Sequence, residues 1–251
     1  MPATPAWPPR SAPRLFVDER LEAGAQVRIE GQQAHYLTKV MRLADGQVVI
    51  LCDDQTGEWS TIPAEIGKRH VTLDVMMRLR QREEVPDIWL CPALLKKDRF
   101  DLVLEKATEL GVARIRPVIT RRCVADKLNA DRASAIVTEA AEQCARTALP
   151  ELGEVSKLDA LLRDWPAERV LFFADEQGGA PAAEAFAKAG APAAILTGPE
   201  GGFDDAEREA IRAHPQARAV TLGPRILRGE TAAIAALALW MGVAGDWRGE
   251  G

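Results

Sequence analysis

Two short apolar runs that each stop at glycine and proline constrain this chain most. The first leads through Ala194-Ile195-Leu196-Thr197-Gly198-Pro199-Glu200-Gly201-Gly202-Phe203, and the second through Leu222-Gly223-Pro224-Arg225-Ile226-Leu227-Arg228-Gly229-Glu230-Thr231. A short apolar run that ends at such residues is typical of a strand that leads into a tight loop. Two such loops can form the walls of one pocket.

The residues of these loops favour ligand recognition by backbone amides. Glycine permits positive φ and a close approach of the ligand, whereas Pro199 and Pro224 fix the loop direction and remove an N–H donor. The spacing Gly-Pro-Glu-Gly-Gly matches neither the phosphate-binding loop that ends in Gly-Lys-Ser/Thr nor the dinucleotide pattern Gly-x-Gly-x-x-Gly. A nucleoside-like ligand therefore fits better than a polyphosphate. The alternative interpretation is two ordinary strand-to-helix turns.

The composition is ordinary for a soluble globular chain of 251 residues, with 47% hydrophobic and 27% charged residues. The formal net charge of -5 argues against indiscriminate binding of polyanions, because non-specific nucleic-acid affinity comes mainly from phosphate neutralisation. Any nucleic-acid site must therefore be a local basic patch.

Several protein classes are disfavoured by simple patterns. The cysteines occur singly, without a Cys-x-x-Cys pair or a histidine at ligand spacing, so we expect no metal site and a reducing, cytoplasmic location. Residues 1–13 contain five prolines and no signal-peptide pattern, which predicts a flexible leader. The most apolar run, Ala232 to Ala244, is too short for the roughly 20 residues of a membrane span, so we expect no membrane association.

Short alternating segments separated by glycines run from Arg14 to about Arg80 and predict a small β-barrel domain with one short helix, at about Gln33 to Met41. The polar segment that follows ends at Pro86 and is expected to be a linker. We therefore place the first domain at 14–82 and the second at 83–251. The expected strands are Leu15–Val17, Val27–Ile29, Val48–Cys52, Thr61–Ile66 and Val71–Met77.

Beyond the linker, strands alternate with longer helical patterns, which predicts an α/β domain built from parallel βα units. The C-terminal helix is apolar on nearly all faces, which favours cover by the sheet and by a second subunit of a dimer. Gly111 is expected just after a helix, and Asp204 with Glu207 resembles a capping box. The expected strands are 88–93, 115–120, 170–174, 193–197 and 219–222, and the expected helices are 98–110, 132–147, 181–188, the segment from Asp204 to before Pro215, and 232–244.

A local excess of four positive charges between Val112 and Arg132 is the best candidate for a phosphate-contacting surface. It includes Arg121 and Arg122, and Lys96, Lys97 and Arg99 extend it. The alternative is a solvated charged face. On the helix expected from Arg132, a stripe at i, i+4 and i+7 either reads a base edge or only pairs on the helix surface. That stripe consists of Glu139, Gln143 and Arg146.

Arg228 and Glu230 fall between the second loop and the final helix, where the helix dipole favours an anionic Glu230 by about 0.3 to 1 kcal/mol. The alternative is that Glu230 or Thr231 only caps helix amides. The three histidines are isolated from candidate nucleophiles, so a Ser-His-Asp or Cys-His mechanism has no support.

Taken in order, these residues resemble the SPOUT methyltransferases with a deep trefoil knot, and among them the ribosomal small subunit methyltransferase E family. The resemblance covers nearly the whole chain from Arg14 onward, and the order of the motifs carries it rather than any one of them. Its residues are Arg14-Leu15-Phe16-Val17, His35-Tyr36-Leu37, Val40-Met41-Arg42, Lys96-Lys97, Glu105-Lys106-Ala107-Thr108-Glu109-Leu110-Gly111, Glu139 through Arg146, Pro150 and both glycine loops.

The resemblance implies methylation of N3 of a uridine in small-subunit 16S ribosomal RNA, with S-adenosyl-L-methionine as cofactor. It also implies a homodimer in which an N-terminal PUA-like β-barrel precedes a knotted α/β domain, although true knots are rare. Arg14 and Arg146 would contact RNA. The cofactor would be held by Leu196, Thr197, Gly198, Pro199, Glu200, Gly201, Gly202, Leu222, Gly223, Ile226, Leu227, Thr231 and Ala232.

This chemistry needs alignment rather than a metal or a covalent intermediate, and positioning supplies roughly 7 to 11 kcal/mol. N3 of neutral uracil carries a proton, so we expect Glu230 to act as base or hydrogen-bond partner and Arg228 to stabilise the anion. Gly229 departs from the bulkier residue usual in the family, which leaves both roles open.

Two other functions compete with this one. One is a non-catalytic RNA-binding or ribosome-assembly protein, and the other is a nicotinamide-dependent oxidoreductase, which lacks its fingerprint here. A SPOUT enzyme could also methylate a ribose or another ring nitrogen of a different RNA.

Overall fold

The computed structural model describes residues 12–248, which fall into two compact units. One unit runs to Glu84 and includes Ala141–Ala148, and the other consists of Val85–Ala140 and the chain from Leu149 onward. The predicted leader at 1–13 lies almost wholly outside the described residues. No helix within 12–248 is long and apolar enough to cross a membrane.

The first unit is a five-stranded sheet in the order β1-β3-β4-β5-β2. Strand β1 runs parallel to β3, and the other pairs are antiparallel. Within the described residues no ladder joins β1 to β2, so closure into a barrel stays a prediction. The strands are β1 (Arg14–Phe16), β2 (Gln26–Glu30), β3 (Val49–Cys52), β4 (Gly57–Ile66) and β5 (His70–Gln81).

Alternation of side chains builds the core of this sheet. In β2 only Val27 and Ile29 are buried, as expected when one face meets the core and the other meets solvent. The expected single helix is a short α1 (Gly31–His35) that continues as the π-helical turn η1 (Tyr36–Val40). Leu37 of this turn is fully buried in the same core cluster.

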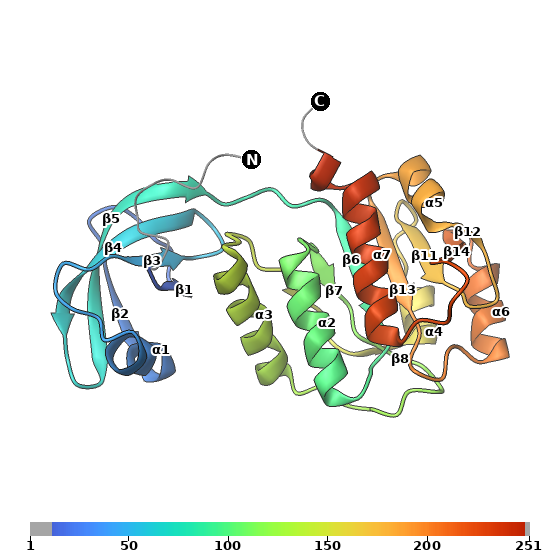
Figure 1. The fold of residues 1–251 in the computed structure, drawn as a ribbon, viewed down its shortest axis with the longest axis horizontal. Coiled ribbons are helices and arrows are strands. Elements are labelled where there is room, and N and C mark those ends of the chain that lie inside the picture. Colours follow the sequence, from blue (N-terminus) through green and yellow to red (C-terminus); the bar gives the residue numbers. More distant parts are fainter. Residues whose placement is uncertain (1–11, 249–251) are drawn as a thin grey trace. The chain divides into compact units, whose positions relative to one another are not determined.

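The second unit is a seven-stranded parallel sheet in the order β12-β14-β11-β13-β6-β7-β9 (Figure 1). A separate parallel pair joins β8 to β10. The strands are β6 (Ile88–Pro92), β7 (Arg114–Ile115), β8 (Val118–Ile119), β9 (Glu151–Leu152), β10 (Ser156–Lys157), β11 (Val170–Ala174), β12 (Ala180–Pro181), β13 (Ala193–Thr197) and β14 (Ala217–Thr221). The helices are α2 (Lys97–Glu109), α3 (Ala130–Cys144), whose end from Ala141 belongs to the first unit, α4 (Leu158–Arg163), α5 (Ala182–Ala189), α6 (Asp205–Ala213), α7 (Gly229–Val243) and the short η2 (Asp246–Arg248).

Helices cover both faces of the large sheet, which explains its almost continuously apolar central strands. In β11, Phe172 packs in the cluster with α2, α5 and α7, while Leu171 and Phe173 pack on the other face with α4 and α6. Helix α7 packs beside α2 and over β6 and β13, as Figure 1 shows. The cover of its remaining side by a second subunit stays a prediction.

Several predicted elements were wrong in their bounds. β4 begins four residues before the expected strand, β5 ends four residues after it, and α7 begins three residues before the expected helix. Two further differences have a clear physical cause. The expected strand 115–120 is split into β7 and β8, because Pro117 lies between them and cannot donate to a ladder. The expected helix 132–147 ends at Cys144, where Ala145 adopts a left-handed φ of 62°. Arg146 therefore lies outside the helical stripe that Glu139 and Gln143 share.

Candidate active site

Both glycine loops line a single cavity of about 190 Å³ in the second unit. The loops leave β13 and β14, which flank β11 as parallel neighbours, so three carboxyl ends meet at this edge of the sheet. Ligands of open α/β sheets bind at this edge. The lining residues are Ala174, Asp175, Glu176, Gly198, Pro199, Gly202, Phe203, Arg208, Val220, Thr221, Leu222, Gly223, Pro224, Arg225, Ile226, Leu227, Gly229 and Ala232.

The structure brings most of the predicted cofactor residues to this cavity. Gly198, Pro199, Gly202, Leu222, Gly223, Ile226, Leu227 and Ala232 line it. Leu196, Thr197, Glu200, Gly201 and Thr231 are absent from its lining. Leu196 and Thr197 are buried inside β13, and Glu200 faces Arg99, so these residues support the loop or lie beside the cavity.

Glycine is required at two points of the cavity wall. Gly202 and Gly223 adopt φ values of +66° and +111°, in the left-handed region that side chains disfavour. At Gly198, an added Cβ would lie 3.3 Å from the ring of Phe203. Glycine therefore permits the left-handed backbone of both loops and the close approach of Phe203 to Gly198.

Glu230 is a buried carboxylate in the first turn of α7. Its Oε1 lies 3.8 Å from Nε of Arg99, and Nη1 of Arg99 lies 3.3 Å from Oε1 of Glu200. Arg99 thus lies between Glu200 of the first glycine loop and Glu230, which follows the second. Oε2 of Glu230 is buried without a hydrogen-bond partner among the described residues. A buried polar atom without a partner costs free energy and calls for a functional explanation.

Arg228 is the N-cap residue of α7, and its own side chain makes no capping hydrogen bond. The side chain is exposed and forms no ion pair with the described residues. Gly229, the first residue of α7, is buried, and an added Cβ would lie 2.8 Å from Cδ2 of Leu95 and 3.1 Å from the carbonyl oxygen of Gly198. Gly229 therefore allows the helix start to approach the first loop closely.

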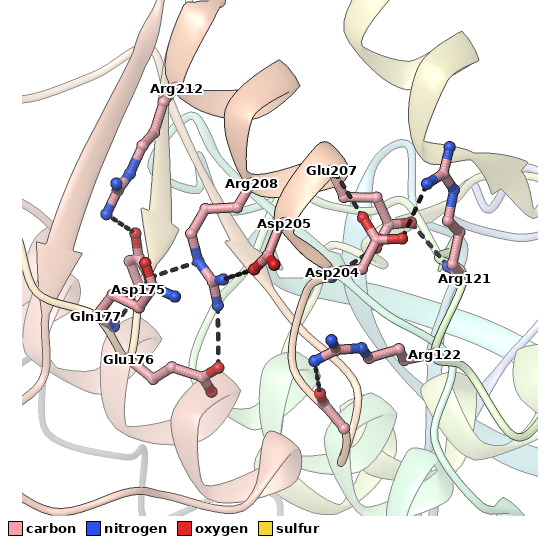
Figure 2. A network of polar contacts seen from close by, with 11 residues as sticks. Arg121, Arg122, Asp175, Glu176, Gln177, Asp204, Asp205, Glu207, Arg208 and Arg212 are labelled. Carbon is pink, nitrogen blue, oxygen red and sulfur yellow. Dashed lines mark hydrogen bonds and ion pairs between the residues drawn. The ribbon is translucent and has the colours of Figure 1, made fainter.

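Sequence analysis missed the third wall of the cavity, which follows β11. There Asp175 and Glu176 contact Arg208 of α6, as Figure 2 shows. Gly178, Gly179 and Pro181 follow this segment, so the apolar run of β11 also stops at glycine and proline, and this is the signal that could have found it. The parallel pairing of β11 between the two other loop strands then brings the three loops together.

The predicted RNA-contacting arginines of the second unit are anchored to the first glycine loop (Figure 2). Arg121 donates from Nη1 to Oδ2 of Asp204 at 2.9 Å, and Arg122 donates from Nη1 to the carbonyl oxygen of Gly201, also at 2.9 Å. Asp204 caps α6 in a full capping box with Glu207. The backbone N–H of Glu207 holds the pKa of Asp204 below its usual value, and the hydrogen bond from Arg121 adds to this effect. Lys96, Lys97 and Glu139 are exposed.

In the first unit, Arg14 and Arg80 both pair with the buried Glu58. Arg146 has a side chain only 5% exposed, and its Nε lies 3.8 Å from Oε1 of Glu83. Burial lowers the pKa of Arg146, and the nearby Glu83 opposes this shift. Gln143 is exposed. The RNA contacts of Arg14, Gln143 and Arg146 stay predictions.

The described residues hold no group of metal-ligating side chains. Burial raises the pKa of Cys91, in β6, to about 12, and of Cys52, in β3, to about 12. Both thiols are therefore protonated at neutral pH and act as small core residues.

The match to family models decides which family these features belong to. Residues 82–241 match the model of an RNA methyltransferase domain, and residues 29–76 match the model of an RNA methyltransferase PUA domain. The chain belongs to the RNA methyltransferase family that includes ribosomal RNA small subunit methyltransferase E. The resemblance stated from the sequence is confirmed, and the chain is an RNA methyltransferase.

Curated relatives named ribosomal RNA small subunit methyltransferase E match along most of their length. The protein of Bacillus subtilis is 30% identical over 89% of this chain and 94% of its own. The protein of Synechocystis is 31% identical over 90% of this chain and 76% of its own.

Solved structures of this family have the same fold. A ribosomal RNA small subunit methyltransferase E from Neisseria gonorrhoeae, bound to S-adenosyl methionine, has a TM-score of 0.86 at 28% identity and covers 94% of this chain and 99% of its own. A methyltransferase from Legionella pneumophila, also in complex with that cofactor, has a TM-score of 0.82 at 28% identity with the same coverage.

Proposed function

We propose that this chain transfers the methyl group of S-adenosyl-L-methionine to N3 of a uridine in 16S ribosomal RNA of the small subunit. The observation that carries the proposal is the cavity between the two glycine loops, with Gly229 and Ala232 in its wall and the buried Glu230 between them in sequence. Family membership and the names of the relatives support the same substrate class.

The residues present fit an adenosyl cofactor. The glycines at positions 198, 202 and 223 all line the cavity, and at Gly223 an added Cβ would meet no atom within 4 Å, which suits a nucleoside held by backbone groups. Apolar Leu222, Ile226 and Leu227 would contact the base. When bound, this cofactor supplies an electrophilic methyl group on a sulfonium.

Glu230 is well suited to take the N3 proton of the target uracil. Its Oε2 accepts no hydrogen bond from residues 12–248, and Glu230 directly follows Gly229 of the cavity wall, so this oxygen is the candidate proton acceptor. The N3–H bond breaks toward Glu230 while the N3–methyl bond forms and the methyl–sulfur bond breaks. The sulfonium becomes a neutral thioether, and atoms and charge balance.

Two arginines have supporting roles in this proposal. Arg99 lies between Glu200 and Glu230 and would hold the carboxylate of Glu230 in position beside the first loop. Arg228 has an exposed guanidinium that pairs with no described carboxylate, so it is available to the uracil oxygens, where negative charge develops. Because N3 lies on the pairing edge, the uridine must be unpaired or extruded.

The basic residues beside the first loop would contact the RNA backbone. Arg121 and Arg122 are tied to α6 and to the loop, so phosphate binding there is coupled to the position of the cavity wall. Lys96 and Lys97 lie at the start of α2 and extend this surface. In the first unit, where residues 29–76 match a PUA domain model, the candidate contact is Arg14, which lies outside the matched range.

Further features belong to the same proposal. The chain would act in the cytoplasm, and it would act as a homodimer. We place α7 at the dimer interface because Ile234, Ala235 and Ala238 are partly exposed apolar residues outside the core clusters. A closed barrel at 14–82 and a trefoil knot within 83–251 are also part of it, by family resemblance.

The test is transfer of a labelled methyl group from S-adenosyl-L-methionine to purified small and large ribosomal subunits from cells that lack this gene. Label in small-subunit RNA alone is the expected result. Label only in another RNA would contradict the substrate class. Lack of transfer and of S-adenosylhomocysteine binding would favour a non-catalytic assembly factor.

A further inference from the structure

A buried arginine fixes one carboxylate at the wall of the cavity (Figure 2). The side chain of Arg208 is 6% exposed, and its Nη2 donates to Oε1 of Glu176 at 3.0 Å. Its Nε donates to Oδ1 of Asp175 at 3.1 Å, and the side chain of Asp175 is fully buried. Because Asp175 neutralises and orients Arg208, the guanidinium presents a fixed donor to Glu176.

Glu176 lies against the end of the first glycine loop. A Cβ added to Gly202 would lie 2.7 Å from Oε1 and 2.9 Å from Oε2 of Glu176. Both residues line the cavity. The carboxylate therefore occupies the space that any side chain at position 202 would take, and glycine there keeps the carboxylate in place.

One oxygen of this carboxylate is available to a ligand. Arg208 contacts Oε1, whereas Oε2 accepts no hydrogen bond from the residues that the structure describes. The side chain is 44% exposed, so its outer part meets solvent or a bound molecule. An ionised acceptor makes hydrogen bonds roughly twice as strong as a neutral one.

We propose that Glu176 binds the ribose hydroxyls of the adenosyl cofactor, and that Arg208 is its positioning residue. This inference rests on the proposed function. The two neighbouring ribose hydroxyls are hydrogen-bond donors, and a carboxylate accepts from both. In dinucleotide-binding α/β folds, which differ from this one, an acidic side chain binds the ribose in the same way. Gly229 approaches the beginning of the first loop at Gly198, and Glu176 approaches its end at Gly202. Glu176 and the helix that carries Glu230 therefore contact different residues of this loop.

Arg212 offers a matched control for Arg208. It donates from Nη2 to Oδ2 of Asp175 at 2.6 Å and is one turn further along α6. It makes no contact with Glu176 among the described residues. If Arg208 acts by positioning Glu176, Arg208→Lys should weaken binding of ligands that carry the ribose hydroxyls, whereas Arg212→Lys should not.

The experiment is calorimetric titration with S-adenosylhomocysteine and with 5′-methylthioadenosine, which keeps the ribose but lacks the amino-acid portion. Glu176→Ala is expected to weaken both ligands by about tenfold to a hundredfold, the range for a hydrogen bond to a charged group. Glu209→Ala removes an exposed carboxylate of α6 outside the cavity and is expected to change neither affinity.

The 2′,3′-dideoxy analogue of 5′-methylthioadenosine identifies the ligand atoms. Wild type, Glu176→Ala and Arg208→Lys are expected to bind it with equal affinity, whereas a general structural defect would weaken it too. Loss of S-adenosylhomocysteine affinity alone would assign Glu176 to the ammonium and overturn the inference, as would unchanged affinity for both ligands. Failure of the wild type to bind S-adenosylhomocysteine would contradict the proposed function as well.

Discussion

The carboxylate of Glu230 combines burial with an unpartnered oxygen, a state that a purely structural residue rarely keeps. Glu230→Gln keeps the shape but cannot accept the N3 proton. We expect kcat to fall by about 10² to 10⁴-fold, the usual contribution of general acid–base catalysis. The melting temperature should not fall, because the variant removes a buried charge whose partner, Arg99, is partly exposed.

Single-turnover kinetics with calorimetry on the same protein checks this prediction. Affinity for S-adenosylhomocysteine should stay unchanged. Full turnover by Glu230→Gln would remove Glu230 as the base and move the proton transfer to another group or to water.

Gly229 explains how α7 meets the first glycine loop. Gly229→Ala would bring a Cβ to 2.8 Å from Leu95 and 3.1 Å from the Gly198 carbonyl oxygen. We expect a loss of about 1–3 kcal/mol of unfolding free energy, the usual cost of overpacking. Urea denaturation measures this loss of unfolding free energy. The loss should be smaller in a Leu95→Ala background, because the Cδ atoms of Leu95 that the new Cβ would meet are then absent.

An equal loss in both backgrounds would show that contact with Leu95 does not set the cost. The sequence left the roles of Arg228 and Glu230 open because Gly229 departs from the family pattern. In the structure, Gly229 sets the spacing between α7 and the first glycine loop.

The first turn of α6 joins the basic surface to the cavity wall. Asp204 accepts a hydrogen bond from the backbone N–H of Glu207 at 2.7 Å and pairs with Arg121. Because the pKa of Asp204 is lowered in the folded state, its stabilising contribution is complete above its unfolded pKa of about 3.9 and is lost as pH falls through the lower folded value.

Asp204→Ala should therefore lower the melting temperature at pH 6, and the difference from wild type should shrink below about pH 4. Differential scanning calorimetry across this range is the measurement. A difference that grows on acidification would contradict the assignment of the lowered pKa to the cap.

Long periodic elements were predictable, and short ones were not. The strands ending at Thr197 and Ala174 and the capping box at Asp204 follow from local patterns and agree with β13, β11 and α6. The two-residue strands β9, β10 and β12 are too short to carry a period, and β8 is separated from β7 by Pro117. The end of α3 at Cys144 was missed because the left-handed residue that follows is Ala145 rather than glycine.

The same limit applied to the candidate site. Two of its walls follow glycine-rich loops and were found from the sequence, whereas Asp175, Glu176 and Arg208 were missed. Their association depends on the parallel pairing of β11 with β13 and β14, which no local pattern encodes.

The partly exposed apolar side of α7 is the expected dimer interface. Its buried side fills the core of the second unit, while Ala235 and Ala238 are partly exposed on an otherwise apolar helix. We expect Ala238→Arg to convert a dimer into a monomer, because a charge at the centre of an apolar interface is left unpaired. Sedimentation velocity measures the mass, with Glu209→Arg on the exposed side of α6 as control.

A wild-type protein that sediments as a monomer would contradict the dimer directly. An Ala238→Arg variant that stays dimeric would move the interface away from this face of α7.

The most direct test of the proposed function is mass spectrometry of nucleosides after wild-type protein, S-adenosyl-L-methionine and unmodified small subunits are incubated together. The cavity, Glu230 and the family of the chain predict N3-methyluridine in 16S ribosomal RNA, and its much slower formation with Glu230→Gln. A ribose-methylated nucleoside or a base methylated elsewhere would contradict the proposed proton transfer at N3.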